Sequence, residues 1–231
     1  MDYIQLIRSL TVAALPILVS ITFHEVAHGW VAYKLGDDTA KVSGRLTLNP
    51  LAHIDLMGTV VMPIILFILS RGSFIFGSAK PVPVNFSNLK NYRRDTALVA
   101  AAGPMTNVLL SVASILLTVI VVRFFPGSYE SGSTSSLVML PVMEMLKYSI
   151  YFNFFLAAFN LIPVPPLDGG RIVVSLLPYR QAYQYSKIEP YGIFIVLLLW
   201  VTGLAEYVLM PLKLLIHFII DLFLIPFGGL L

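Results

Sequence analysis

The chain of 231 residues has no cysteine and few charges, and these two absences narrow its class. Without thiols it can form neither a disulfide framework nor a thiolate zinc site, which leaves imidazoles and carboxylates as its strong metal ligands. Only 12% of its residues are charged, about half the share in a soluble globular protein, while 58% are hydrophobic. The composition therefore predicts an integral membrane protein, with the lipid bilayer as its surroundings.

Long apolar runs divide the chain into six candidate membrane segments. They lie at about 10–33, 56–70, 96–125, 137–162, 191–204 and 207–227. As a helix, the second would rise about 21 Å, less than the roughly 30 Å needed to cross a bilayer upright. We therefore expect an all-α polytopic membrane protein with five to six transmembrane or re-entrant segments.

Two stretches between these segments do not have a helical pattern. Residues 72–85 contain Pro81 and Pro83, which fix φ and remove amide donors, so this stretch is expected to be extended. Residues 41–48 alternate polar and apolar side chains around Ser43-Gly44, as short hairpins do. We expect a small β-hairpin and an extended strand close to the polar cluster described next.

The first apolar run holds the pentad His24-Glu25-Val26-Ala27-His28. On a helix, residues four apart share one face, so the two imidazoles can bind one tetrahedral metal ion while Glu25 faces its bound water as a base. The alternative is that neighbouring helices satisfy these polar groups. An unpaired ionisable group in hydrocarbon costs about 3 kcal/mol or more, and such groups are mostly functional, which favours the metal site.

A catalytic zinc ion usually has three protein ligands, so the histidines need a partner from elsewhere in the chain. Asp168 is the strongest candidate, because it follows a proline-terminated apolar run and precedes Gly169 and Gly170, which allow a tight turn. On its own, the Asp-Gly pair fits a solvated turn equally well. His53, in an Asn-Pro loop, is the weaker alternative ligand.

Three blocks together resemble the site-2 protease family of intramembrane zinc metalloproteases. They are the pentad, the AGPMTN stretch at 102–107 and the block at 160–170, and they occur in the family's order. The resemblance covers the chain from its first apolar segment to about residue 180. It implies one Zn²⁺ ion held by His24, His28 and Asp168. It also implies that Glu25 activates water to cut a peptide bond inside the membrane or at its edge.

The resemblance further implies roles for residues around these ligands. Asn160 and Asn107 are implied to support the substrate or the oxyanion. Structural roles near the site fall to Gly103, Pro104, Gly169 and Gly170. Because only a short loop joins the third and fourth segments, the chain resembles the short form without an inserted PDZ domain. We expect one membrane metalloprotease domain over 1–231, with a catalytic core at about 4–180 and a C-terminal helical hairpin at about 189–227.

The ligand positions constrain how the segments run. His24 lies late in the first segment and Asp168 at the end of the fourth, so these helices must run parallel to bring both side chains within bonds of about 2 Å of one ion. Two full crossings between them would make them antiparallel, so the short second segment is expected to re-enter and return to its starting side. One side then carries Lys34, Lys41, Arg45, Lys90, Arg93, Arg94, Arg171, Arg180 and Lys187, against Arg8, Arg123 and Lys147 on the other. The positive-inside rule makes the first side cytoplasmic, so the site of this multi-pass cell-membrane or inner-membrane protein is expected to open there.

The sequence thus predicts an intramembrane zinc endopeptidase that cleaves transmembrane segments of single-pass proteins. Its expected partners are such substrates and the bilayer, and a homo-oligomer is left open. The formal charge of +3 is small and spread through loops, so nucleic acid is not expected. The first alternative is a transporter that uses the same residues as a metal or proton relay, and the second is a non-proteolytic metal-binding scaffold.

The last segment carries a polar stripe that consists of Glu206, Lys213, His217 and Asp221. Its near-helical spacing has the pattern of an internal ion-paired seam or an interfacial helix.

Overall fold

The structure, a computed structural model, describes residues 3–69, 77, 79–125 and 135–224 of the chain. Within these ranges the protein is helical and contains no β-strand, so the expectation of an all-α fold is confirmed for the described part. The expected apolar segments all contain helices: α1 (Tyr3–Leu35), α3 (Met62–Leu69), α4 (Tyr92–Phe124), α5 (Ser136–Asn160), α8 (Gly192–Val201) and α9 (Leu204–Leu224).

Two of these helices are long and apolar enough to cross a membrane. They are α1, over Ile7–Leu35, and α4, over Tyr92–Phe124. A helix of about 20 apolar residues already covers the hydrocarbon core, so both exceed the required length. The count of five to six membrane segments stays a prediction.

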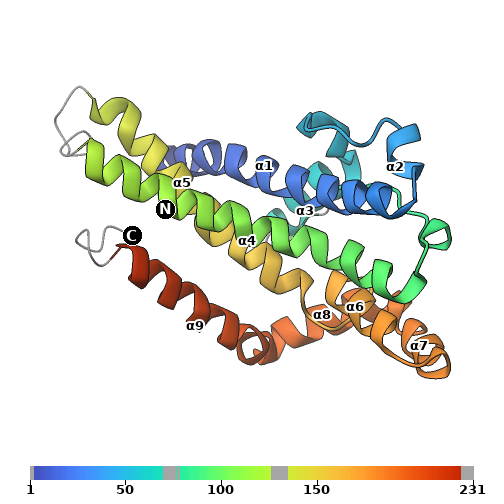
Figure 1. Cartoon of the computed structure of the whole chain (residues 1–231). Helices are drawn as coiled ribbons and strands as arrows, with labels where there is room; N and C mark the ends of the chain where they lie inside the picture. Colours follow the sequence, from blue (N-terminus) through green and yellow to red (C-terminus); the bar gives the residue numbers. More distant parts are fainter. Residues whose placement is uncertain (1–2, 70–76, 78, 126–134, 225–231) are drawn as a thin grey trace.

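The central group of the fold consists of α1, α4 and α5, which lie alongside one another (Figure 1). At one end of this group Arg8 on α1 forms an ion pair with Glu144 on α5, at 3.1 Å. At the other end His24 lies beside Asp168, which follows α5 in the chain. Because both contacts advance in the same direction along the sequence, α1 and α5 run parallel, as the ligand positions predicted.

Helix α4 runs antiparallel to α1. Its later residue Asn107 hydrogen-bonds the Ser20 carbonyl, whereas its earlier residue Val99 contacts His28, further along α1. The contact between α4 and α5 uses small polar side chains, such as Ser111, whose hydroxyl donates to the Ile150 carbonyl at 3.0 Å. Small residues and hydrogen bonds between helices are the means by which helices associate in a bilayer, where lipid is as apolar as a leucine side chain.

The segment between α1 and α4 begins and ends at the same end of this helix group. Asp37, just after α1, accepts hydrogen bonds from the Asn85 amide and the Asn88 side chain, just before α4. The second apolar run is a turn of π-helix (Leu56–Val61) that continues into the short α3. The two ends of the whole segment between α1 and α4 thus lie together, and the re-entry of the second apolar run stays a prediction.

The predicted β-hairpin at 41–48 is wrong. Thr39–Val42 instead form α2, and the amides of Ser43 and Arg45 donate back to the Thr39 and Ala40 carbonyls. Gly44 then turns the chain with φ of +65°. These helix-like bonds use the amides that a strand ladder would need, so alternation of side chains alone did not produce a strand. Residues 79–85 are non-helical, as expected, and the rest of the 72–85 stretch lies largely outside the described residues.

The C-terminal part continues through α6 (Asp168–Leu176) and α7 (Tyr179–Ser186) to α8 and α9, which join at Gly203 with φ of +75°. In Figure 1 α8 and α9 meet at an angle, and the predicted hairpin of helices stays untested. Ile220 of α9 packs against Ile115 and Ile150. In the polar stripe, Lys213 and Glu206 form an exposed ion pair at 3.2 Å, and the choice between an internal seam and an interfacial helix stays open.

Candidate metal centre

Three side chains that could bind a metal converge where α1 meets the start of α6. His24 and His28 lie one turn apart on α1, and Asp168 is the first residue of α6. The two Nε2 atoms are 3.1 Å apart, and each lies 3.3 Å from Oδ2 of Asp168. The structure therefore brings together the three residues that the sequence predicted as ligands. Among the described residues, their donor atoms lie close enough together to bind one metal ion.

Both histidines turn their Nε2 atoms toward Asp168 because their Nδ1 atoms are held by α4. His28 Nδ1 lies 2.7 Å from the Val99 carbonyl oxygen, which can only accept, so Nδ1 carries the proton. His24 Nδ1 lies 2.6 Å from Oδ1 of Asn107. When these imidazoles are neutral, as metal ligands must be, the proton sits on Nδ1 and both Nε2 atoms present bare lone pairs.

The amide of Asn107 is itself fixed in one orientation. Its nitrogen donates to the Ser20 carbonyl at 3.2 Å and to Oδ1 of Asn153 at 2.8 Å, so its oxygen must face His24. Asn153 donates in turn to the Ser149 carbonyl. Asn107 and Asn153 are both fully buried. Both amide protons of Asn107 are engaged, so in this structure its side chain supports a metal ligand, and the substrate or oxyanion role implied by the resemblance stays a prediction.

The site residues fit a zinc ion. The Nε2 atoms of His24 and His28 both face Oδ2 of Asp168, and no hydrogen-bond partner for this buried oxygen lies among the described residues. Metal-binding imidazoles are neutral, and in that state these three lone pairs repel one another unless a cation lies between them. Tetrahedral ligands at zinc bonds of about 2.0–2.1 Å are about 3.3–3.4 Å apart, close to the separations of these three donors. Two nitrogens and one carboxylate oxygen form a typical catalytic zinc set that leaves one position open.

Gly103 allows α4 to approach the imidazoles. A Cβ at this position would lie 2.6 Å from Cε1 of His24 and would overlap Nε2 of His28. The neighbouring Pro104 is fully buried inside α4 and has no N–H, so one carbonyl of the helix loses its usual partner. The structural role expected for Gly103 is therefore visible as close packing against the ligands.

Gly169 and Gly170 act differently from the expected tight turn. Both lie inside α6, and neither has a positive φ. A Cβ on Gly169 would overlap the Leu161 carbonyl, and one on Gly170 would overlap the backbone at Pro165. These glycines thus allow the loop 161–167 to fold tightly over the first turn of α6, which places Asp168 beside α1.

Glu25, the predicted base, follows His24 directly and is partly buried. Its Oε2 accepts a hydrogen bond from the backbone N–H of Val82 at 2.8 Å. The non-helical segment that contains Val82 therefore lies against the pentad, although residues 79–85 form no β-strand. No pattern in the sequence marked Val82, Val99 or Asn153 as part of the site.

His53 is not part of the group of three donors, and the Asn160 side chain is engaged within its own helix. His53 is buried, and its Nε2 contacts the Thr47 carbonyl oxygen at 2.9 Å, which accounts for one ring nitrogen within the loop. The Asn160 side chain donates to the Leu156 carbonyl of its own helix, at 3.0 Å. The substrate role implied for Asn160 stays a prediction.

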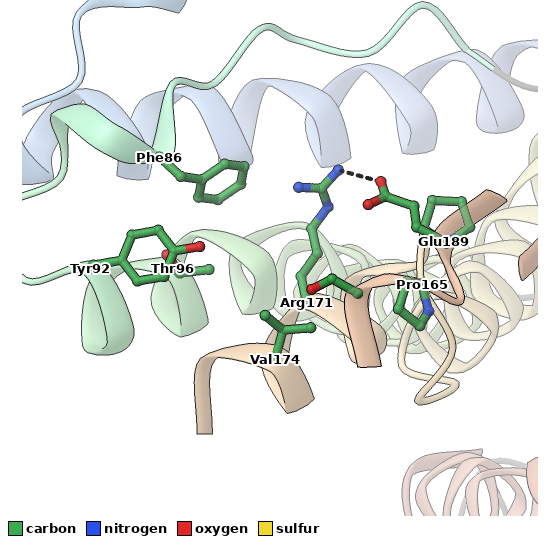
Figure 2. Close-up of a pocket in the computed structure, with 9 residues that line it drawn as sticks. Phe86, Tyr92, Thr96, Pro165, Arg171, Val174 and Glu189 are labelled. Atoms are coloured by element: carbon green, nitrogen blue, oxygen red, sulfur yellow. Dashed lines mark ion pairs between the residues drawn. The ribbon is translucent and has the colours of Figure 1, made fainter. Parts of the chain in front are cut away.

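A cavity of about 140 Å³ lies beside α6, one helical turn beyond Asp168. Figure 2 shows Arg171 crossing it, with its guanidinium between the Phe86 ring and the Glu189 carboxylate. The ion pair of Arg171 and Glu189 is long, at 3.8 Å, and both side chains are partly exposed. Thr96 of α4 also lines the cavity, and among the described residues its buried hydroxyl finds no hydrogen-bond partner.

Comparison with known proteins agrees with this site. The model for peptidase family M50 matches residues 12–203. The Bacillus subtilis protein named "Putative zinc metalloprotease YwhC" is 40% identical over 84% of this chain and 82% of its own length. Rip2 proteins of Mycolicibacterium smegmatis and Mycobacterium tuberculosis H37Rv, named in the same way, are 27% and 30% identical, and the match spans 64% of each of them. No solved structure matches the chain.

Proposed function

Because the chain belongs to peptidase family M50, the site-2 protease family, and is a zinc metalloprotease, we propose that it cleaves transmembrane segments of single-pass membrane proteins. The observation that carries this proposal is the convergence of His24, His28 and Asp168 at 3.1–3.3 Å on the side of an apolar helix. The scaffold alternative has no use for a base beside the ligands, whereas hydrolysis requires one.

The chain's own residues supply the parts that peptide hydrolysis needs. Zinc held by His24, His28 and Asp168 would supply a polarised water and a Lewis acid for the scissile carbonyl. The Glu25 carboxylate would take a proton from that water and hand it to the leaving amine. Its Oε2 is held by the Val82 amide, so Oε1 is the oxygen that we assign to proton transfer. The surrounding helices limit the access of bulk water.

The membrane placement is part of the proposal. α1 carries two of the ligands and is one of the two helices in the described part of the chain that are both long and apolar enough to span a bilayer, which supports a site within or at the edge of the hydrocarbon. We propose a multi-pass protein of the cell or inner membrane with five to six membrane segments, in which α3 re-enters. The basic residues near the ligand end of α1 and α4 support a site that opens to the cytoplasm.

A substrate helix hides its carbonyls in its own hydrogen bonds, so we propose that it unwinds locally and pairs with the segment at 79–85. The backbone of this segment is already engaged at several points: the Lys80 and Val82 amides donate inside the protein, and the Lys80 carbonyl accepts from Arg45. The Asn85 amide is engaged as well, so a substrate would pair through the backbone groups of the segment that these contacts leave open. Glycine or proline near the cleavage site should raise the cleavage rate, and an unchanged rate would contradict local unwinding.

The test uses purified protein in liposomes with a single-pass membrane substrate. We expect Glu25→Gln to keep one zinc per chain and to lose at least about a thousandfold in cleavage, because the base is removed while the ligands stay. His24→Ala should lose both zinc and cleavage. Zinc transport into the liposomes without any cleavage by the wild-type protein would contradict the protease and favour the transporter.

A further inference from the structure

The pentad is connected to a segment that the proposed chemistry does not explain. The N–H of Val82 donates to Oε2 of Glu25 at 2.8 Å. Val82 stands between Pro81 and Pro83, which have no N–H, so its amide is the one backbone donor across these three residues. We propose that Val82 is a positioning residue whose amide holds the Glu25 carboxylate in its working orientation. The inference rests on the proposed function.

Val82 is seated on the same face of α1 that carries Glu25. Its side chain is buried, at 7% exposure, and lies against Gly29, one helical turn after Glu25. A Cβ on Gly29 would come within 2.6 Å of Cγ1 of Val82. α1 therefore contacts Val82 at two positions four residues apart. The Glu25 carboxylate accepts from its amide, and the space beside Gly29 holds its side chain.

The segment around Val82 is fixed by groups outside the pentad. On one side the Lys80 amide donates to the His53 carbonyl at 2.9 Å. On the other side the Asn85 amide donates to Oδ2 of Asp37 at 2.8 Å. The two prolines restrict the backbone further. The Val82 amide is thus held in place independently of Glu25, as a preorganised donor must be.

This arrangement assigns different tasks to the two oxygens of Glu25. Oε2 is engaged by the amide, which leaves Oε1 for proton transfer. A hydrogen bond to a charged group changes an equilibrium by roughly 10- to 100-fold, so without it the carboxylate would spread over other rotamers. If Glu25 is held in one rotamer, its carboxylate stays close to the geometry that proton transfer needs. The hydrogen bond should therefore affect the rate of proton transfer rather than substrate binding.

The contact is tested by amide hydrogen exchange resolved to single residues, on zinc-free protein in detergent. In Glu25→Ala we expect the Val82 amide to exchange roughly tenfold faster or more, because its acceptor is removed. The Lys80 and Asn85 amides are internal controls, since their acceptors remain, and their exchange should change less than about twofold. Unchanged exchange at Val82, or an equal increase at all three amides, would overturn the inference.

The consequence for the reaction is tested on the zinc-loaded enzyme with two variants. Val82→Pro removes the N–H, and we expect it to keep one zinc per chain and its KM while kcat falls roughly 10- to 100-fold. Val82→Ala keeps the N–H, so its loss of kcat should be several-fold smaller. Equal losses in the two variants, or loss of zinc from Val82→Pro, would overturn the positioning role. If the wild-type protein cleaves nothing, the proposed function fails, and the exchange experiment still decides whether Val82 holds Glu25.

Discussion

His24 Nδ1 lies 2.6 Å from Oδ1 of Asn107, and this hydrogen bond ties a ligand on α1 to a side chain on α4. The Asn107 amide cannot turn over, because its nitrogen donates to the Ser20 carbonyl and to Asn153. Ser20 of α1 and Asn153 of α5 thus orient Asn107 of α4, and Asn107 in turn keeps the His24 proton on Nδ1. Partners of this kind orient metal ligands and are typically worth 10- to 100-fold in metal affinity.

Asn107→Leu should therefore weaken zinc binding about 10- to 100-fold, because it removes the acceptor that keeps the His24 proton on Nδ1. Titration against a competing chelator measures this change. Asn160→Leu is the matched control, since the Asn160 amide bonds the carbonyl of its own helix. Zinc affinity in that control should stay within about twofold of wild type. Equal affinities in the two variants would contradict the role assigned to Asn107.

Gly103→Ala should abolish stoichiometric zinc binding while the helices stay folded. Alanine favours a helix over glycine by about 1 kcal/mol, so a loss of zinc cannot come from helix propensity. It follows instead from the added Cβ, which would overlap His28 and lie 2.6 Å from His24 Cε1. Metal analysis and circular dichroism check the two parts. Ala102→Gly, which adds no atom, should retain zinc, and one zinc per chain in Gly103→Ala would refute the packing argument.

Zinc should raise the thermal stability of the protein, because an ion that binds the folded chain shifts unfolding by mass action. At a free concentration of about 100 times Kd this stabilisation is about 2.7 kcal/mol. A thermal melt with and without chelator measures it. The shift should persist in Glu25→Gln, which keeps the three ligands, and vanish in Asp168→Ala. An equal shift in Asp168→Ala would show that zinc binds elsewhere.

Asp37 should make the stability of the fold depend on pH. Burial by itself raises the pKa of its carboxyl, but hydrogen bonds from Thr39, the Asn85 amide and Asn88 outweigh burial and lower the pKa below its ordinary value. The folded protein therefore releases this proton at lower pH than the unfolded chain does. Asp37 stabilises the fold above pH about 4, and this contribution is lost as the pH falls through the folded pKa.

Asp37→Asn should accordingly lower the free energy of unfolding by about 2 kcal/mol at pH 7, and the difference from wild type should shrink below pH about 4. Thermal unfolding in detergent from pH 7 to pH 3 measures the difference. Asp38→Asn is the control, because Asp38 is exposed and makes no side-chain cap hydrogen bond. A difference that stays constant across this range would contradict the argument from the lowered pKa.

The ligands could be predicted because the features that identify them are local. The spacing of His24 and His28 follows from the helical period, and the parallel course of α1 and α5 follows from where His24 and Asp168 lie in their segments. The supporting residues could not be predicted in this way. Val82 and Asn107 lie 57 and 83 residues from their partners in the pentad, and neither stands in a pattern that names a partner.

The errors have physical causes as well. Alternation at 41–48 suggested a hairpin, but strand pairing needs a partner that alternation does not specify. The Asp37 carboxylate accepts from the Thr39 amide two residues on, which forms a local turn where α2 begins. Gly169 and Gly170 were expected to permit a turn. In the structure they matter because they have no side chain where α6 packs against the preceding loop. The sequence identifies a glycine, but it does not show which atoms a Cβ at that position would overlap.

The two imidazoles differ in how they can be disturbed by mutation. His28 is held by the main-chain oxygen of Val99, which every residue type supplies, so substitutions at position 99 leave that acceptor in place. His24 is held by a side chain that a single codon change removes. Substitutions that leave the three ligands in place should thus weaken the metal site mainly by releasing His24.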